Sequence, residues 1–216
     1  MIYESHPWRD ELMRTAARLD AKATQRRWTE QSFYLVERDL LVGAFAVRRL
    51  VESFKVPDSV AAMQLPALQF SRTGKLADVY NKFEIWELFD LERPTRTTLG
   101  LRDFCNQLIH SWVLQLSFRE LDSMLDGVFV ASERGRSTRL LLFETGIIAT
   151  TFRTVAQEDV VSSRMTQSPD GQWSYVDLKG PSDLGRTMGV DEGCERVAGA
   201  EEQRGARIGV GDLAER

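Results

Sequence analysis

The sequence predicts an α+β fold in which a mainly helical N-terminal bundle is followed by β-hairpins and a disordered C-terminal tail. Three observations carry this prediction. Apolar residues recur at helical spacing through much of residues 1–120, strand-like runs flanked by turn sequences occupy residues 125–176, and glycine is frequent in residues 177–216. We therefore expect a single domain over residues 1–176 and a glycine-rich tail beyond it.

Two helices are expected at the start of the chain. Pro7 suits a first helical turn, and the apolar residues after it recur at helical spacing, namely Trp8, Leu12, Ala16 and Leu19. A longer helix is predicted from about Trp28 to Phe54, ended by Pro57. Its apolar stripe consists of Phe33, Val36, Leu40, Ala44, Val47, Val51 and Phe54. Asp58 is expected to cap a short helix that ends near Met63.

The middle of the chain carries a mixed pattern. The spacing of apolar residues in the segment 67–93 predicts a helix, although Phe83 to Trp86 also suits a strand. Pro94 and the threonines that follow it predict a loop. A further helix is expected from about Leu99 to Leu116.

After Asp126-Gly127 the pattern becomes strand-like. Residues 128–130 and 139–143 are apolar runs around a polar turn, which predicts a hairpin, and a short helix is expected near residues 148–155. A second hairpin is predicted around Pro169-Asp170-Gly171, with its second strand at residues 173–176. Residues 177–216 hold eight of the 15 glycines without a phosphate-loop motif, which predicts disorder.

Composition excludes several classes of protein. The 216 residues are 43% hydrophobic and 28% charged, with a formal net charge of −4. No apolar stretch approaches the roughly 18 residues that a membrane helix needs, and no signal peptide is recognisable, so we expect a cytoplasmic protein. Two cysteines and two histidines exclude a disulfide framework and a His-rich metal centre. We therefore expect no cofactor, no metal and no membrane partner.

One helix carries the candidate chemistry. At about 100° per residue, Arg102, Asn106 and His110 follow each other at steps of about 40°, and Asp103 and Gln107 extend this polar face. The opposite face is expected in the core and consists of Leu101, Phe104, Cys105, Leu108 and Trp112. Cys105 is accordingly expected to be buried and inert.

This polar face suits a phosphodiester substrate. Histidine can move protons near neutral pH, and the planar guanidinium of arginine matches phosphate oxygens. The backbones of Arg102 and His110 are about 12 Å apart along a helix, so a homodimer would bring one chain's arginine close to the histidine of the other. Glu37 or Arg38 of the long helix is a further candidate to face His110.

Arg102-Asp103, six residues and then His110 resembles the signature of HEPN domains, which is an arginine, a polar residue, four to six residues and a histidine. The resemblance implies a helical bundle that acts as a dimeric, metal-independent RNase, of the kind found among toxins and antiphage defence proteins. It implies that Arg102 and His110 are catalytic and that Asp103 is their polar companion. The implied reaction is attack of an RNA 2′-hydroxyl on the adjacent phosphate, which leaves a 2′,3′-cyclic phosphate.

Two interpretations of the polar face stay open. In the first, Arg102 and His110 are catalytic, with support from Asp103 and Asn106, and RNA is the partner. In the second, the same residues are structural hydrogen-bonding groups of a non-catalytic protein-binding or regulatory module.

A second polar feature is the cluster of Arg134, Arg136 and Arg139 near a hairpin turn. Such a turn suits contacts with nucleic-acid phosphates, whereas a pI of about 5.4 favours an ordinary solvated turn.

Overall fold

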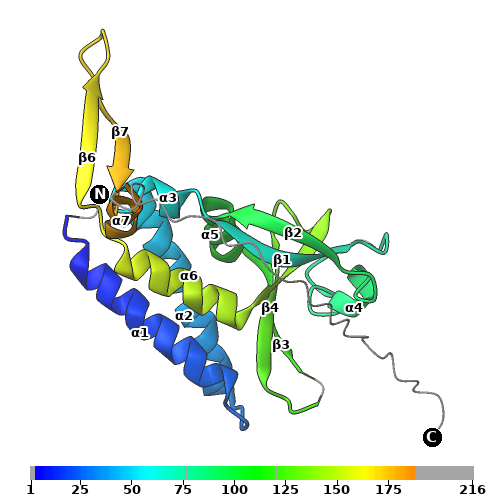
Figure 1. Cartoon of the computed structure of the whole chain (residues 1–216). Helices are drawn as coiled ribbons and strands as arrows, with labels where there is room; N and C mark the ends of the chain where they lie inside the picture. The colour runs from blue at the N-terminus through cyan, green and yellow to red at the C-terminus, as the bar shows by residue number, and fades with distance from the viewer. Residues whose placement is uncertain (1–2, 76, 120, 188–216) are drawn as a thin grey trace, which may run out of the picture.

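The computed structural model describes residues 3–75, 77–119 and 121–187 and has the α+β fold that the sequence predicts, with helices first and antiparallel strands after them. The three long helices are α1 (His6–Ala23), α2 (Glu30–Glu52) and α6 (Thr145–Gln157). They pack together and cover one face of the main sheet (Figure 1). None of the helices in the described ranges is long and apolar enough to cross a membrane.

The main sheet has five antiparallel strands in the order β2-β1-β5-β4-β3. The strands are β1 (Gln64–Ser71), β2 (Thr95–Gly100), β3 (Ser111–Phe118), β4 (Leu125–Ser132) and β5 (Arg139–Glu144). β4 and β5 form the first predicted hairpin around the turn at residues 133–138. The short helix α5 (Leu101–Ile109) packs between α2 and the sheet.

The two long N-terminal helices confirm the periodicity argument. The side-chain oxygen of Thr29 accepts a hydrogen bond from the Ser32 N–H (3.3 Å) and caps α2. The stripe on α2 is buried from Val36 to Leu50, whereas Phe33 and Phe54 at its ends are about half exposed. A four-residue helix, α3 (Asp58–Ala61), follows as expected, but the prediction that Asp58 caps it is wrong. Pro57 is the N-cap and Asp58 is the first helical residue, whose Oδ2 accepts instead from the N–H of Leu178 (3.0 Å).

The segment 67–93 is where the sequence prediction is wrong. Instead of a helix the chain forms strand β1 and then only a single helical turn, α4 (Ile85–Leu88). The apolar residues that suggested a helical stripe are exposed in the structure, as Val79, Tyr80 and Phe83 show. The predicted loop after Pro94 is strand β2, because its β-branched threonines pair with β1.

The prediction of a helix over residues 99–116 is also wrong for the second half of that segment. α5 ends at Ile109, and β3 begins at Ser111 and pairs along its length with β4. The alternation of this stretch was hidden because the residues on both faces of β3 are at least partly buried. Trp112 therefore belongs to the outer face of the sheet and not to α5.

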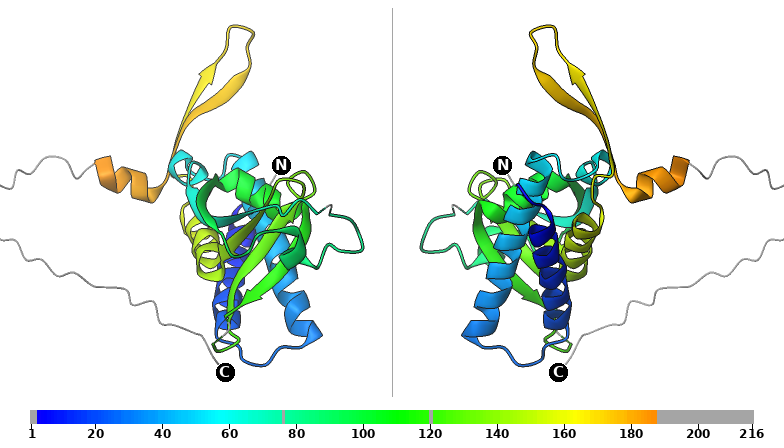
Figure 2. Two further views of the ribbon diagram at one scale, coloured as in Figure 1. Left: turned by 90° about the vertical axis from the view of Figure 1, so that its right-hand side faces the viewer. Right: turned by 90° about the vertical axis from the view of Figure 1, so that its left-hand side faces the viewer.

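A second hairpin leaves the body of the molecule. It is formed by β6 (Ser162–Gln167) and β7 (Trp173–Lys179) and projects outward as a two-stranded ribbon (Figure 2). The hairpin confirms the Pro-Asp-Gly prediction, but the tail prediction placed its boundary too early. β7 runs to Lys179, and helix α7 (Pro181–Thr187) follows; the rest of the predicted tail, residues 188–216, lies outside the described residues.

Apolar side chains pack on both faces of the main sheet. The larger cluster lies between the sheet and the helices and contains the aromatic rings of Phe104, Phe143 and Phe152. The smaller cluster lies on the outer face, beneath α4, and contains Phe70 and Leu140. α5 is thereby held with its apolar face against the sheet and its polar face outward.

Candidate functional site

Helix α5 buries the face that the sequence assigns to the core. Leu101, Phe104, Cys105 and Leu108 are each 1% exposed or less. Burial raises the pKa of the Cys105 thiol to about 12, which keeps it protonated and unreactive near neutral pH. This part of the prediction is confirmed, and it directs the polar face of α5 away from the core.

His110 is the residue at which α5 ends, and it is exposed. Its backbone N–H donates to the Asn106 carbonyl (3.1 Å), and its own carbonyl accepts from the N–H of Glu133 (3.0 Å). The backbone is thus fixed between α5 and the β4–β5 turn. The imidazole ring remains open to solvent.

The side chain of Arg48 reaches this polar face from α2. Its Nη1 donates to Asn106 Oδ1 (2.9 Å) and lies 3.4 Å from His110 Nε2. A guanidinium has only donors, so when this contact is a hydrogen bond His110 Nε2 is its acceptor. Because 3.4 Å is long for a hydrogen bond, an incoming substrate could displace it at small cost.

Glu52, one turn after Arg48, joins several arginines. Its Oε1 accepts from Arg48 Nε (2.9 Å) and lies 3.7 Å from Arg102 Nη2, while its Oε2 is 3.0 Å from Arg49 Nη1. The hydrogen bond from Arg48 is the main reason that the pKa of the Glu52 carboxyl is lowered from its ordinary value of 4.5. We refer to Arg48, Glu52, Arg102, Asn106 and His110 as the His110 cluster.

The structure therefore brings Arg102 and His110 into one network, linked through Glu52 and Arg48. Asp103 is exposed, and within the described chain no arginine lies within 4.0 Å of its carboxylate. Neither Glu37 nor Arg38 faces His110, and Arg38 pairs instead with its neighbour Asp39 (2.7 Å).

Sequence reasoning missed Arg48 and Glu52. The only signal was their i,i+4 spacing beside the apolar stripe of α2, which is typical of an ordinary surface ion pair. Which helix such a pair faces depends on the packing of α2 against α5, and no local pattern encodes that packing.

The three arginines of the β4–β5 hairpin, two in the turn and Arg139 at the start of β5, are of two kinds. Arg136 pairs with Glu133 (3.2 Å) and its guanidinium lies over the ring of Trp112, 4.8 Å from the centroid. Arg134 and Arg139 instead line a cavity of about 470 Å³, which we call the Arg134 pocket. Its other lining residues are Gln69, Gln107, Ser132, Gly135 and Thr138.

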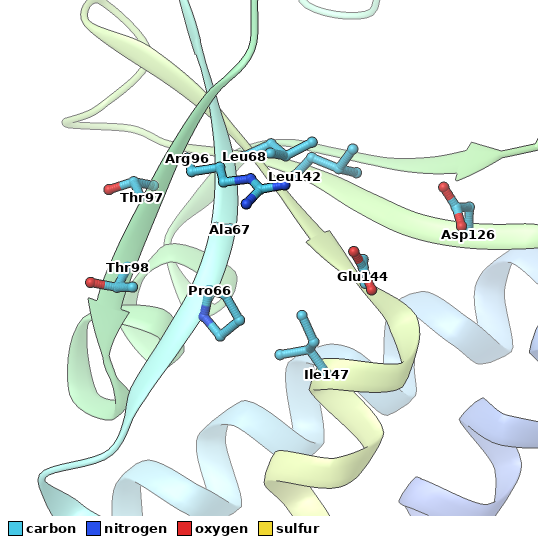
Figure 3. Close-up of a pocket in the computed structure, with 10 residues that line it drawn as sticks. All are labelled: Pro66, Ala67, Leu68, Arg96, Thr97, Thr98, Asp126, Leu142, Glu144 and Ile147. Carbon is cyan, nitrogen blue, oxygen red and sulfur yellow. The ribbon is translucent and has the colours of Figure 1, made fainter. Parts of the chain in front are cut away.

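A cavity of about 830 Å³ lies on the outer face of the sheet, away from the His110 cluster. Figure 3 shows Arg96 extending across β1 toward Leu142, with the carboxylates of Glu144 and Asp126 at the other side. This cavity is lined by charged groups of both signs but by no histidine, the side chain that most readily transfers protons near neutral pH. We therefore place the candidate chemistry at His110.

The described residues contain no cluster of three or more histidine, cysteine, aspartate or glutamate side chains that could hold a metal ion. No family model, no curated protein and no solved structure matches this chain.

Proposed function

We propose that this chain is a metal-independent endoribonuclease in which His110 moves a proton and Arg48 and Arg102 hold the phosphoryl group. The observation that supports the proposal is the exposed imidazole of His110 with its Nε2 facing the Arg48 guanidinium at 3.4 Å. An accepting Nε2 is the form that a general base needs, and an adjacent guanidinium suits the charge that develops on phosphate oxygens.

The proposed step balances without an added co-reactant. The RNA 2′-oxygen attacks the adjacent phosphorus and its proton passes to His110 Nε2. The P–O5′ bond breaks, and the O5′ leaving group takes a proton from water, which reaches the exposed ring. The hydroxide formed from that water removes the proton from the imidazolium, so His110 returns to its neutral form and water is regenerated. The products are a 2′,3′-cyclic phosphate and a 5′-hydroxyl end.

Glu52 would tune this site. Its carboxylate holds Arg48, Arg49 and Arg102 in place, which limits the entropy lost when a phosphate binds. It also offsets part of their positive charge, so phosphate must compete with an internal partner. In this proposal Glu52 is a positioning residue and does not touch the substrate.

The experiment is cleavage of a fluorophore–quencher RNA by the purified chain in EDTA, with His6→Ala as the matched control. His6 lies on α1, where its side chain is 82% exposed and contacts Asp10. We expect His110→Ala to lower the rate by about 10²- to 10⁴-fold and His6→Ala to leave it unchanged. The melting temperature of His110→Ala should match wild type, because the ring is not buried. A wild-type chain that leaves RNA intact, or equal rates for both variants, would remove the proposal.

A homodimer would complete the site, and one surface favours it. Val42 and Phe45 of α2 are 45% and 47% exposed and line an apolar pocket of about 360 Å³ together with Trp8, Leu41 and Ile109. Ile109 directly precedes His110, so a second copy bound here would lie beside the His110 cluster. Phe45→Arg should then reduce the mass measured by light scattering from dimer to monomer and lower cleavage with it.

The β6–β7 ribbon favours the second candidate function, a protein-binding module. In the described chain its strands pair only with each other, and Trp173, Met165 and Val176 are 63%, 46% and 46% exposed. An isolated two-stranded hairpin is only marginally stable in water, so exposed apolar side chains on it suit a bound partner. If His110→Ala cleaves like wild type while Trp173→Ser abolishes self-association in sedimentation, this second function is favoured.

A further inference from the structure

We propose that the Arg134 pocket binds a phosphate group of the RNA strand, one other than the phosphate at which cleavage takes place. The inference rests on the proposed function and adds a substrate-holding site to it. The pocket lies at the β4–β5 turn, and its volume of about 470 Å³ exceeds what one phosphate group needs, so part of a nucleotide fits with it.

The hydrogen-bonding groups of the pocket favour a ligand that accepts. Three side-chain oxygens that could themselves accept are already engaged: Gln69 Oε1 binds Arg139 Nη1 (3.0 Å), Gln107 Oε1 binds the Ser132 N–H (3.3 Å), and Ser132 Oγ binds the Gly135 N–H (3.1 Å). The groups left for a ligand are mainly guanidinium and amide N–H donors. A phosphate oxygen accepts from such donors, whereas a ligand that only donates would compete for engaged acceptors.

The charge of the pocket favours an anion. In the described part of the chain neither Arg134 nor Arg139 has a carboxylate within 4.0 Å, whereas Arg136 of the same turn pairs with Glu133 (3.2 Å). Two uncompensated guanidinium groups around one cavity repel each other, and a bound phosphate removes that repulsion.

Helix α5 and the β4–β5 turn connect the pocket to the His110 cluster. Gln107 lies one helical turn before His110, and the Glu133 N–H donates to the His110 carbonyl (3.0 Å), which joins the turn to the end of α5. A Cβ on Gly135 would lie 3.8 Å from Gln107 Oε1, so the turn and α5 are in contact. A strand bound at His110 can therefore continue into the pocket without leaving the surface.

The experiment measures binding of a fluorescein-labelled 2′-O-methyl RNA of ten nucleotides by anisotropy. Such a strand lacks the attacking hydroxyl, so the full wild-type chain can be used. Arg134→Gln should weaken binding by roughly tenfold, and adding Arg139→Gln should weaken it further. Arg136→Gln is the matched control and should stay within about threefold. The slope of log affinity against log salt should fall by about 0.7 in Arg134→Gln, because the variant neutralises one phosphate fewer.

The outcomes separate the sources of the phosphate and the two proposals. Binding that is unchanged in the Arg134→Gln and double variants, or lowered equally by Arg136→Gln, overturns the phosphate site. If uridine monophosphate binds wild type as tightly as the strand does, and the same variants weaken its binding, the pocket is a mononucleotide site and the strand proposal is overturned. If cleavage depends on His110 but the Arg134→Gln and double variants bind the strand as wild type does, only the phosphate-site proposal is overturned. If the Arg134→Gln and double variants bind the strand more weakly but cleavage does not depend on His110, the phosphate site stands and the ribonuclease proposal is overturned.

Discussion

Replacing Arg9 of α1 should cost several kcal/mol of stability, as much as the loss of a buried apolar side chain. It is only 6% exposed, and its guanidinium donates to the carbonyls of Val155 (2.6 Å) and Glu158 (2.9 Å) and to Asp159 Oδ1 (2.9 Å). The last turn of α6 has no basic residue of its own, so Arg9 satisfies helix-end carbonyls that would otherwise lack donors. It thereby joins α1 to the end of α6.

The expected loss of stability follows from these hydrogen bonds. Hydrogen bonds to a charged group are each worth about 1.5–3 kcal/mol, but they are not additive. Each buried carbonyl left without its donor costs about 1–3 kcal/mol, so the loss of Arg9 should total about 3–5 kcal/mol; the Asp159 carboxylate, which is 55% exposed, adds little. For a chain of this size, that corresponds to a fall in melting temperature of roughly 10 °C.

The assay is urea unfolding of Arg9→Met followed by circular dichroism, beside Arg14→Met as control. Methionine retains an apolar stem that can fill the site of the arginine carbons. Arg14 lies on the same helix with a side chain that is 67% exposed and a single i,i+3 partner, so its replacement should cost under about 0.5 kcal/mol. Equal midpoints for the two variants would refute the capping role of Arg9.

Two further predictions concern α2. Because the pKa of Glu52 is lowered in the folded chain, its contribution to stability is present above its ordinary value of 4.5 and is lost as the pH falls through the lowered value. The melting temperatures of Glu52→Gln and wild type should therefore differ at pH 7 and converge once the pH is below that lowered value. Gly43→Ala should lower the free energy of unfolding by about 1–2 kcal/mol, because the new Cβ would lie 2.4 Å from the buried ring of Phe152. Gly146→Ala is the control: a Cβ there has no neighbour within 4 Å, so this variant should be as stable as wild type or more stable in the same unfolding assay.

The candidate site was only partly predictable. The polar face of α5 and the burial of Cys105 follow from helical spacing, since residues three and four apart share a face whatever packs against them. Arg48 and Glu52 could not be selected from several charged residues of α2, because the choice depends on how that helix crosses α5. The same holds for the division of the turn arginines into Arg136, which is paired, and the two that line the Arg134 pocket.

By itself, the sequence determined the elements whose signals are local. α1, α2, the β4–β5 hairpin and the β6–β7 hairpin are set by apolar spacing and by turn sequences within a few residues of each other. Only the tertiary structure decided that residues 64–71 and 95–100 are strands, because they are completed by partners that are distant in the chain: β1 pairs with β5, whose residues are some seventy positions later, and β2 pairs with β1. Residues 111–118 pair with the next strand, β4, but partial burial on both faces hides their alternation from the sequence. Those same long-range pairings place α5 beneath α2, and with it the His110 cluster.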